Sequence, residues 1–240
     1  ARARLGENPL YYYGAKNRIW FSSDITPLIT IMDSKPTLSP EAFNLFLTFQ
    51  YIPEPSTPVT GIAQIPAGHF MSVTIDNLNP RLKNYWASEN LSENILNPED
   101  RIKKSLDKAC RLMGTADVPV AVALSGGIDS SLVAAITAKY HHNDLHAFTI
   151  GYSGRPSSDE RNHAEQLASF LQIKFTSIEL GDNDFLLDFP NVMFYMDTPV
   201  ADIAAYGYFS VSRAARAKGY PVLLSGLGGD EFFWGYKWVR

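Results

Sequence analysis

Residues 120–131 read VAVALSGGIDSS, and this stretch decides the fold class of the chain. The apolar run Val120–Leu124 is typical of a buried strand, and residues 132–140 have the pattern of an amphipathic helix. A strand, a tight glycine turn and a helix in succession indicate an α/β fold with a parallel sheet. In open sheets of this kind, ligands bind at the carboxyl ends of the strands, which is where this turn lies.

The composition of the turn suits a phosphate group. Gly126 and Gly127 let the backbone turn sharply and bring several N–H groups toward one point. The hydroxyls of Ser125, Ser130 and Ser131 add donors, and the start of the helix adds partial positive charge. The alternative is a plain strand-to-helix turn with serine caps. The turn has neither the lysine of a Walker loop nor the third glycine of a dinucleotide fingerprint.

Asp129 adds a carboxylate to this anion site, which indicates a bridging cation and hence a nucleotide with Mg²⁺. A second apolar run, Pro221–Leu224, leads into SGLGGDE at residues 225–231, so another carboxylate, Asp230, follows another glycine loop. If the two strands are neighbours, Asp129 and Asp230 can reach one Mg²⁺ on a pyrophosphate from opposite sides. The alternative for Asp230 is a helix cap or an exposed acidic turn.

Strand and helix patterns alternate regularly from residue 119 onward. We expect strands at 119–124, 145–150, 174–179 and 221–225, and helices at 130–140, 158–171 and 202–218. Residues 182–196 are also expected to be helical, with an interruption near Pro190. Alternation of this length predicts a parallel sheet covered on both faces.

The first hundred residues have a different pattern. Residues 10–13 and 18–21 predict a β-hairpin, and Asp24 and Ser39 predict two helix starts, the helices reaching about Ile29 and Gln50. Residues 51–68 are rich in proline, serine and threonine and are interpreted mainly as loop. Extended segments are expected at 69–75 and 83–86, and a helix at 98–113.

The composition excludes several classes of protein. The 240 residues are 45% hydrophobic and 19% charged with a net charge of −4, which is ordinary for a soluble globular chain and gives no attraction to nucleic acid or anionic membranes. No apolar run approaches the ~20 residues of a membrane span. The single cysteine excludes an internal disulfide framework, and we expect a cytoplasmic protein.

The two glycine loops carry a resemblance to a known family. Together with Asp159-Glu160 and Asp197-x-Pro199…Asp202 between them, they resemble the synthetase domain of the asparagine synthetase family, which has an ATP-pyrophosphatase loop (PP-loop). Upstream, residues 2–12 resemble the end of that family's glutaminase domain, a class II amidotransferase of the N-terminal-nucleophile type. Short motifs between them resemble the interdomain segment: Tyr51–Pro53, Ile65–His69 and Tyr85-Trp86.

The resemblance implies a domain organisation. Residues 1–35 are expected to be the β-rich carboxy-terminal part of the glutaminase domain, and residues 36–97 the interdomain segment. Residues 98–240 are expected to be a PP-loop synthetase domain that is incomplete at its carboxyl end. We therefore expect the chain to be a fragment of a longer protein.

The resemblance also implies the chemistry. ATP would activate a carboxylate as an acyl-adenylate, which ammonia converts to an amide, releasing AMP. The implied partners are small molecules, without nucleic acid or membrane, and a homodimer is expected. The implied catalytic residues are Asp129, Asp230 and Glu231, the first two also holding Mg²⁺, with Asp202 at the acceptor. The implied ATP-binding residues are Leu124, Ser125, Gly126, Gly127, Asp129, Ser130, Ser131, Ile150, Ser225 and Gly226.

Several of these residues have plainer alternatives. Leu124 and Ile150 are equally compatible with core positions. Asp202 suits the N-cap of the helix that begins near Ala204, and Glu231 suits a capping role.

Two positions depart from the family pattern. Ala3 stands where the family carries an aspartate that holds the amino group of glutamine, which puts glutamine use in question. Leu227 stands where well-known members place a glutamate, which leaves the acceptor open. Three functions follow: an asparagine synthetase, a relative that amidates another carboxylate or closes a lactam, and a catalytically idle ATP-binding homologue.

Overall fold

The computed structural model describes residues 1–15, 17–74, 77–88, 96–141, 144–156 and 159–236. The chain forms two compact units, an amino-terminal unit of Ala1–Asn94 with Pro190–Asp202, and a carboxy-terminal unit of Ile95–Phe189 with Ile203–Arg240. Each unit is described separately below.

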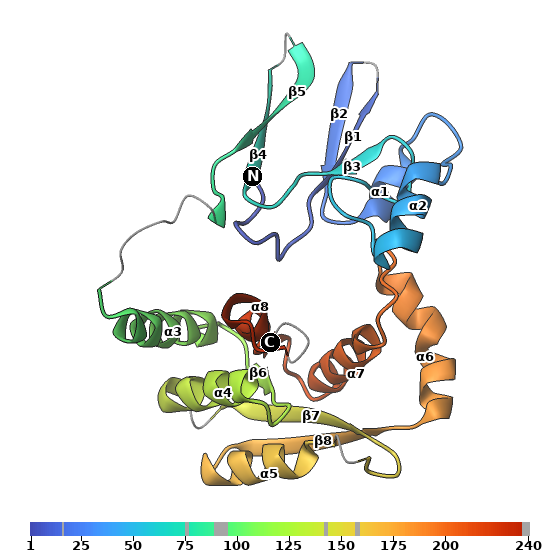
Figure 1. The fold of residues 1–240 in the computed structure, drawn as a ribbon. Helices are drawn as coiled ribbons and strands as arrows, with labels where there is room; N and C mark the ends of the chain where they lie inside the picture. Colours follow the sequence, from blue (N-terminus) through green and yellow to red (C-terminus); the bar gives the residue numbers. More distant parts are fainter. Residues whose placement is uncertain (16, 75–76, 89–95, 142–143, 157–158, 237–240) are drawn as a thin grey trace. The chain divides into compact units, whose positions relative to one another are not determined.

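The amino-terminal unit is built on a three-stranded antiparallel sheet (Figure 1). Strand β1 (Tyr11–Ala15) pairs with β2 (Arg18–Ser22) on one side and with β3 (Ile62–Gln64) on the other. The first two strands confirm the expected hairpin. The core of the unit consists of Tyr11, Tyr13, Ile25, Leu28, Val59 and Ile62.

Two helices follow the hairpin, α1 (Ile25–Thr30) and α2 (Pro40–Phe49). Ser39 begins α2 as expected, since its hydroxyl accepts a hydrogen bond from the amide of Ala42 at 3.2 Å. Asp24 precedes α1 in extended conformation, but its side chain forms no capping hydrogen bond.

One expectation for this unit was confirmed and another was wrong in its bounds. Residues 51–68 are mainly loop as expected, with the short strand β3 inside them, where Ile62 pairs with Tyr13. The strand expected at 83–86 is β5 (Asn77–Asn84), which pairs with β4 (His69–Thr74). The sequence of β5 is polar, so it carries no alternating apolar signal, and its structure comes from backbone pairing with β4.

The buried Arg2 joins the beginning of the chain to distant loops of the same unit. Its guanidinium forms an ion pair with Glu54 and donates to the carbonyl oxygens of Gly6 and Ile65, each at 2.8 Å. The neighbouring Ala3 is exposed, and its carbonyl accepts from the amide of Gly68 at 3.0 Å. Arg2, which lies in the segment 2–12 that resembles the end of the glutaminase domain, therefore has a structural role in this unit.

The carboxy-terminal unit contains a four-stranded parallel sheet in the order β8-β7-β6-β9. The strands are β6 (Val120–Ala123), β7 (His146–Tyr152), β8 (Lys174–Leu180) and β9 (Val222–Leu224). Strand β6 pairs with both β7 and β9, so the two strands that lead into the glycine loops are neighbours. The expectation of an α/β fold with a parallel sheet is confirmed.

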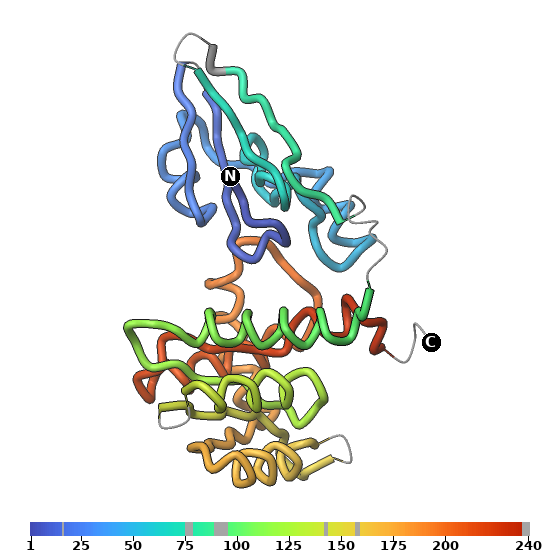
Figure 2. Tube along the Cα trace, turned by 90° about the vertical axis from the view of Figure 1, so that its left-hand side faces the viewer, coloured from blue at the N-terminus to red at the C-terminus, as the bar shows by residue number. Residues whose placement is uncertain are grey.

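Helices cover both faces of this sheet. Helices α4 (Ile128–His141) and α5 (Arg161–Phe170) pack small alanines on one face, and α7 (Ala204–Ala217) packs Val211 and Ala215 on the other. Helix α3 (Pro98–Gly114) lies beside α4, as Figure 2 shows. The short α8 (Gly229–Phe233) follows the second glycine loop.

Three helix boundaries differ from the expectations. Helix α6 (Asp182–Tyr195) contains Pro190 within its span, so the helix is not ended by the proline. Helix α7 begins at Ala204, two residues later than expected, with Ile203 at the N-cap position. Helix α4 begins at Ile128, two residues earlier than expected, which places Asp129 in its first turn.

Among the residues that the structure describes, Phe148 is the largest fully buried side chain, and it lies within β7. We expect Phe148→Ala to lower the free energy of unfolding of the carboxy-terminal unit by about 3–5 kcal/mol, because a large buried ring leaves a cavity. Equilibrium urea unfolding measures this change. The matched control is Phe170→Ala, whose side chain is 83% exposed and whose removal should change stability by less than about 0.5 kcal/mol. Equal effects of the two substitutions would contradict the assignment of the core.

Candidate nucleotide site

A cavity of about 730 Å³ opens at the carboxyl ends of β6, β7 and β9. Its lining comes from the first glycine loop, the end of β7, the start of α7 and the second glycine loop. Of the sequence-predicted residues, the lining includes Leu124, Ser125, Gly127, Asp129, Ser130, Ile150, Ser225, Gly226, Asp230 and Glu231. The topology therefore brings together residues that are up to about a hundred positions apart in the sequence.

Three predicted residues lie elsewhere. Gly126 packs against the start of α5, and Ser131 donates its amide to the carbonyl of Gly127 at 3.1 Å inside the helix. Neither lines the cavity. Asp202 is exposed and belongs to the segment Pro190–Asp202 of the amino-terminal unit, so its proposed contact with an acceptor remains a prediction.

The first glycine loop is held closed by its serines. Gly126 has a φ of +88°, in the left-handed region that favours glycine. The buried hydroxyl of Ser130 accepts from the amide of Ser125 at 3.1 Å and lies 2.9 Å from the Ser125 hydroxyl. The Ser125 hydroxyl in turn accepts from the amide of Gly127 at 3.2 Å. These hydrogen bonds fix the turn and leave the first turn of α4 lining the cavity, where its partial positive charge suits an anion.

The two loops touch at Gly226. A Cβ atom at this position would lie 2.6 Å from the amide nitrogen of Ser130 and 2.8 Å from the carbonyl carbon of Asp129. Only glycine permits two backbones to approach this closely without a shift. The condition set by the sequence analysis, that the two strands are neighbours, is met by this contact and by the pairing of β6 with β9.

The approach of the loops crowds the carboxylates of the site. The carboxyl group of Asp129 occupies the space that a Cβ of Gly229 would need, and that of Asp230 occupies the space beside Gly235. Burial raises the pKa of Asp129, and the charges of Asp230 and Glu231 raise it further. Like charges gathered in this way are suited to a divalent cation.

The residues fit a magnesium ion that arrives with its substrate. Among the described residues, no group of three or more His, Cys, Asp or Glu side chains could hold a metal by itself. Mg²⁺ in nucleotide sites is commonly held by one or two carboxylates plus phosphate oxygens, and Asp129 and Asp230 offer such a pair.

Glu231 has a structural use that favours its capping alternative. One of its carboxylate oxygens accepts from the amide of Gly228 at 2.8 Å, and the other accepts from the hydroxyl of Tyr236 at 2.5 Å. The hydrogen bond from Tyr236, followed by bonds from the backbone, lowers the pKa of Glu231. Glu231 therefore closes the start of α8 and holds Tyr236 beside the cavity.

Several lining residues were missed by the sequence analysis. They are chiefly Gly151, Tyr152, Gly207, Tyr208, Phe233 and Tyr236. No motif marks them. Gly151 and Tyr152 reach the cavity through the pairing of β7 with β6, and Gly207 and Tyr208 through the packing of α7 on the sheet. Phe233 and Tyr236 reach it because they follow the second glycine loop. The position of Gly151 and Tyr152 at the end of a predicted strand was the one available signal. Leu227, which drew attention as a departure from the family pattern, lines the cavity and is 65% exposed.

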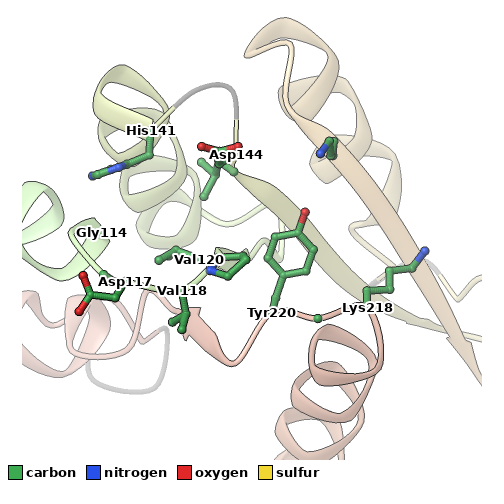
Figure 3. Close-up of a pocket in the computed structure, with 13 residues that line it drawn as sticks. Gly114, Asp117, Val118, Val120, His141, Asp144, Lys218 and Tyr220 are labelled. Atoms are coloured by element: carbon green, nitrogen blue, oxygen red, sulfur yellow. The ribbon is translucent and has the colours of Figure 1, made fainter.

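A second cavity, of about 570 Å³, lies at the amino ends of the same strands (Figure 3). It is bordered by the last turns of α3 and α4 and by the residues after α7, including His141, Lys218 and Tyr220. Helix carboxyl ends carry partial negative charge, which basic residues complement. The lining also contains Asp117 and Asp144, so the charges are mixed and no ligand class is indicated.

Comparison with known proteins agrees with this geometry. Residues 101–240, more than half of the chain, match the sequence model of asparagine synthase, and residues 1–86 match that of a glutamine amidotransferase domain. The chain belongs to the asparagine synthase family. The family resemblance found in the sequence is thereby confirmed.

Individual relatives cover the entire chain. It is 30% identical over 244 residues to the glutamine-hydrolysing asparagine synthetase 1 of Bacillus subtilis, covering 100% of this chain and 38% of that protein. It is 28% identical to asparagine synthetase 2 of Oryza sativa, over 100% of this chain and 37% of that protein. It is 27% identical to the amidase chyE of Penicillium rubens, over 100% of this chain and 38% of that protein. The chain thus spans about two fifths of the length of these relatives.

The similarity to a solved structure is weaker. The NH3-dependent NAD synthetase of Campylobacter jejuni matches 57% of this chain and 60% of its own length, at 16% identity and a TM-score of 0.39. A likeness of this size supports no inference. Among the described residues, no helix of this asparagine synthase family member is long and apolar enough to cross a membrane.

The hydrogen bond between Tyr236 and Glu231 yields a direct titration test. We expect Tyr236→Phe to raise the pKa of Glu231 toward its ordinary value, because the largest cause of the lowering is removed. A depressed carboxyl pKa contributes stability that is present above the ordinary pKa and is lost as the pH falls, so this small contribution should decrease. NMR titration of the Glu231 side-chain carboxyl measures the change. Tyr152→Phe, another tyrosine of the cavity, is the control and should leave the Glu231 titration unaltered.

Proposed function

We propose that this protein is an ATP-dependent amide-forming ligase that produces AMP and pyrophosphate. The observation that carries the proposal is the contact of the two glycine loops at Gly226, which gathers a phosphate-type turn and the Asp129–Asp230 pair around one cavity. The family membership supports the same chemistry, and aspartate with ammonia or glutamine is the first substrate set to examine.

The chemistry proceeds in two substitutions. An oxygen of the acceptor carboxylate attacks the α-phosphorus of ATP, and the bond to pyrophosphate breaks. Ammonia then attacks the acyl carbon, AMP leaves with the bonding electron pair, and the nitrogen loses a proton. Adenylation is needed because a free carboxylate is a poor electrophile.

The residues of the chain act on the leaving pyrophosphate. The backbone amides in the first turn of α4 would stabilise its developing charge, which typically contributes about 3 kcal/mol for each well-placed donor. Asp129 and Asp230 would hold a Mg²⁺ that neutralises charge on the phosphates. Leu124 and Ile150, at strand ends within the lining, are proposed to contact the adenine.

A second candidate is favoured by Leu227. This exposed leucine borders the cavity and offers neither a charge nor a base. An acceptor other than aspartate, amidated or closed to a lactam, is therefore the alternative within the same chemistry. Ala3 motivates the third candidate, a catalytically idle ATP-binding homologue, because its methyl group cannot hold the amino group of glutamine.

The decisive experiment is AMP release by the gene product that carries this chain. It is incubated with Mg-ATP and a panel of carboxylates, in parallel with ammonium or glutamine. AMP and asparagine from both nitrogen sources are expected for an asparagine synthetase. AMP only with other carboxylates would favour the second candidate, and no AMP with any acceptor would refute the ligase proposal.

A stability experiment separates binding from turnover. At a Mg-ATP concentration of about 100 times Kd, binding adds about 2.7 kcal/mol and should raise the Tm of the carboxy-terminal unit by about 5–10 °C. We expect Asp129→Asn to abolish this rise. Because the pKa of Asp129 is raised in the fold, its charge destabilises the unliganded protein as the pH rises above the ordinary value. The variant should therefore have an unliganded Tm no lower than that of the parent.

The control for this experiment is Asp144→Asn, at the opposite edge of the sheet. It should keep the full rise in Tm with Mg-ATP. A rise in Asp129→Asn equal to that of the parent would contradict the role of Asp129 in holding the metal–nucleotide complex. Differential scanning calorimetry provides both measurements.

A further inference from the structure

Arg161 is a buried charge that the proposed chemistry does not use. It is the first residue of α5, its side chain is 7% exposed, and it is not part of the cavity lining. Its Nε donates to both carboxylate oxygens of Asp159, at 2.9 and 2.8 Å, and Nη2 lies 2.5 Å from one of them. Nη1 donates to Glu179 and Nη2 to the carbonyl of Tyr152, each at 2.9 Å.

These contacts join three segments that the sequence keeps apart. Tyr152 ends β7, Glu179 lies near the end of β8, and Asp159 precedes α5. The guanidinium also lies directly over Gly151, where a Cβ atom would overlap it. A planar fork with five donors can satisfy this set of acceptors, whereas a lysine ammonium cannot reproduce its geometry.

The joined residues form one side of the cavity. Gly151, Tyr152, Asp159 and Glu160 all line it, and we name these four residues the β7–α5 wall. The wall also touches the first glycine loop, because a Cβ at Gly126 would lie 3.0 Å from both the Glu160 carbonyl oxygen and the His163 Cβ. A shift of the start of α5 would therefore reach the glycine loop.

The pairing also controls charge at the wall. The Asp159 side chain is 6% exposed, and its hydrogen bonds with Arg161 lower its pKa to about 2. A carboxylate that lost this partner would remain beside the cavity as an uncompensated negative charge. Such a charge opposes the binding of phosphates.

We propose that Arg161 is a positioning residue for the nucleotide: seated on Gly151, it fixes the β7–α5 wall against the first glycine loop and keeps the cavity in its binding geometry. This inference rests on the nucleotide-binding function proposed above. Arg161 acts through Asp159, Tyr152 and Glu179, without touching the cavity itself.

The test uses the gene product that carries this chain and isothermal titration with Mg-ATP. Arg161→Lys keeps the positive charge but loses the planar guanidinium. Gly151→Ala keeps every charged group, but its added methyl group displaces the Arg161 guanidinium from its contact with residue 151. We expect each to raise the Kd for Mg-ATP at least about tenfold, because small displacements around a preorganised site are costly. The matched control is Arg213→Met. It removes a half-exposed arginine of α7 that pairs with Asp188 of α6 and lies outside the cavity lining, so it should change Kd by less than about twofold.

A second measurement needs no ligand. Hydrogen exchange at the amides of Ser125 and Gly127, which donate to serine hydroxyls of the loop, should become at least about tenfold faster in Arg161→Lys, and should be unchanged in Arg213→Met. Circular dichroism establishes that each variant is folded, and Glu179→Gln, which removes a single anchor, provides a milder variant. We expect Glu179→Gln to give a smaller change in the same direction.

The outcomes distinguish the two proposals. Absence of Mg-ATP binding by the parent gene product, together with altered exchange in Arg161→Lys, would refute the nucleotide function and retain the link from Arg161 to the loop. Normal binding by the parent, with unchanged Kd and unchanged loop exchange in the folded variants Arg161→Lys and Gly151→Ala, would refute the positioning role.

Discussion

The close approach of two backbones at Gly226 is the constraint on which the site depends. Strands β6 and β9 pair in parallel, and the loops that follow them must share the space at their carboxyl ends. Because position 226 lacks a side chain, the second loop can lie on the backbone of Asp129 and Ser130. The cavity, the crowding of carboxylates and the raised pKa of Asp129 all follow from this contact.

The parts of the molecule that were predictable from the sequence have local signals. The loops at 125–131 and 225–231 are recognisable because glycines follow apolar runs. The alternation of strand and helix patterns after residue 119 predicts the parallel sheet. Strand β5 and the cavity residues Tyr208 and Tyr236 could not be found in this way. Strand β5 depends on backbone pairing with β4, Tyr208 on the packing of α7 against the sheet, and Tyr236 on its hydrogen bond with Glu231, and no apolar pattern in the sequence encodes these contacts.

Pro190 and Glu231 show how tertiary context decides between two local interpretations. A proline within an apolar helix pattern predicts an interruption, yet α6 continues through it. A glutamate after a metal-ligand candidate suggests catalysis, yet both oxygens of Glu231 are engaged by Gly228 and Tyr236. In each position the residue type permits two outcomes, and the surrounding structure selects one.

The amino-terminal unit is discontinuous along the chain, since it takes in Pro190–Asp202. Within it, Asp197 accepts from the amide of Ile25 at 3.0 Å, and Val200 forms a β-bridge with Tyr51. A polypeptide that ended near Asn94 would contain this unit without those partners. The chain passes between the two units three times, near residues 94, 189 and 202, and not through a single linker. Producing either unit alone therefore requires grafting in or deleting an internal segment.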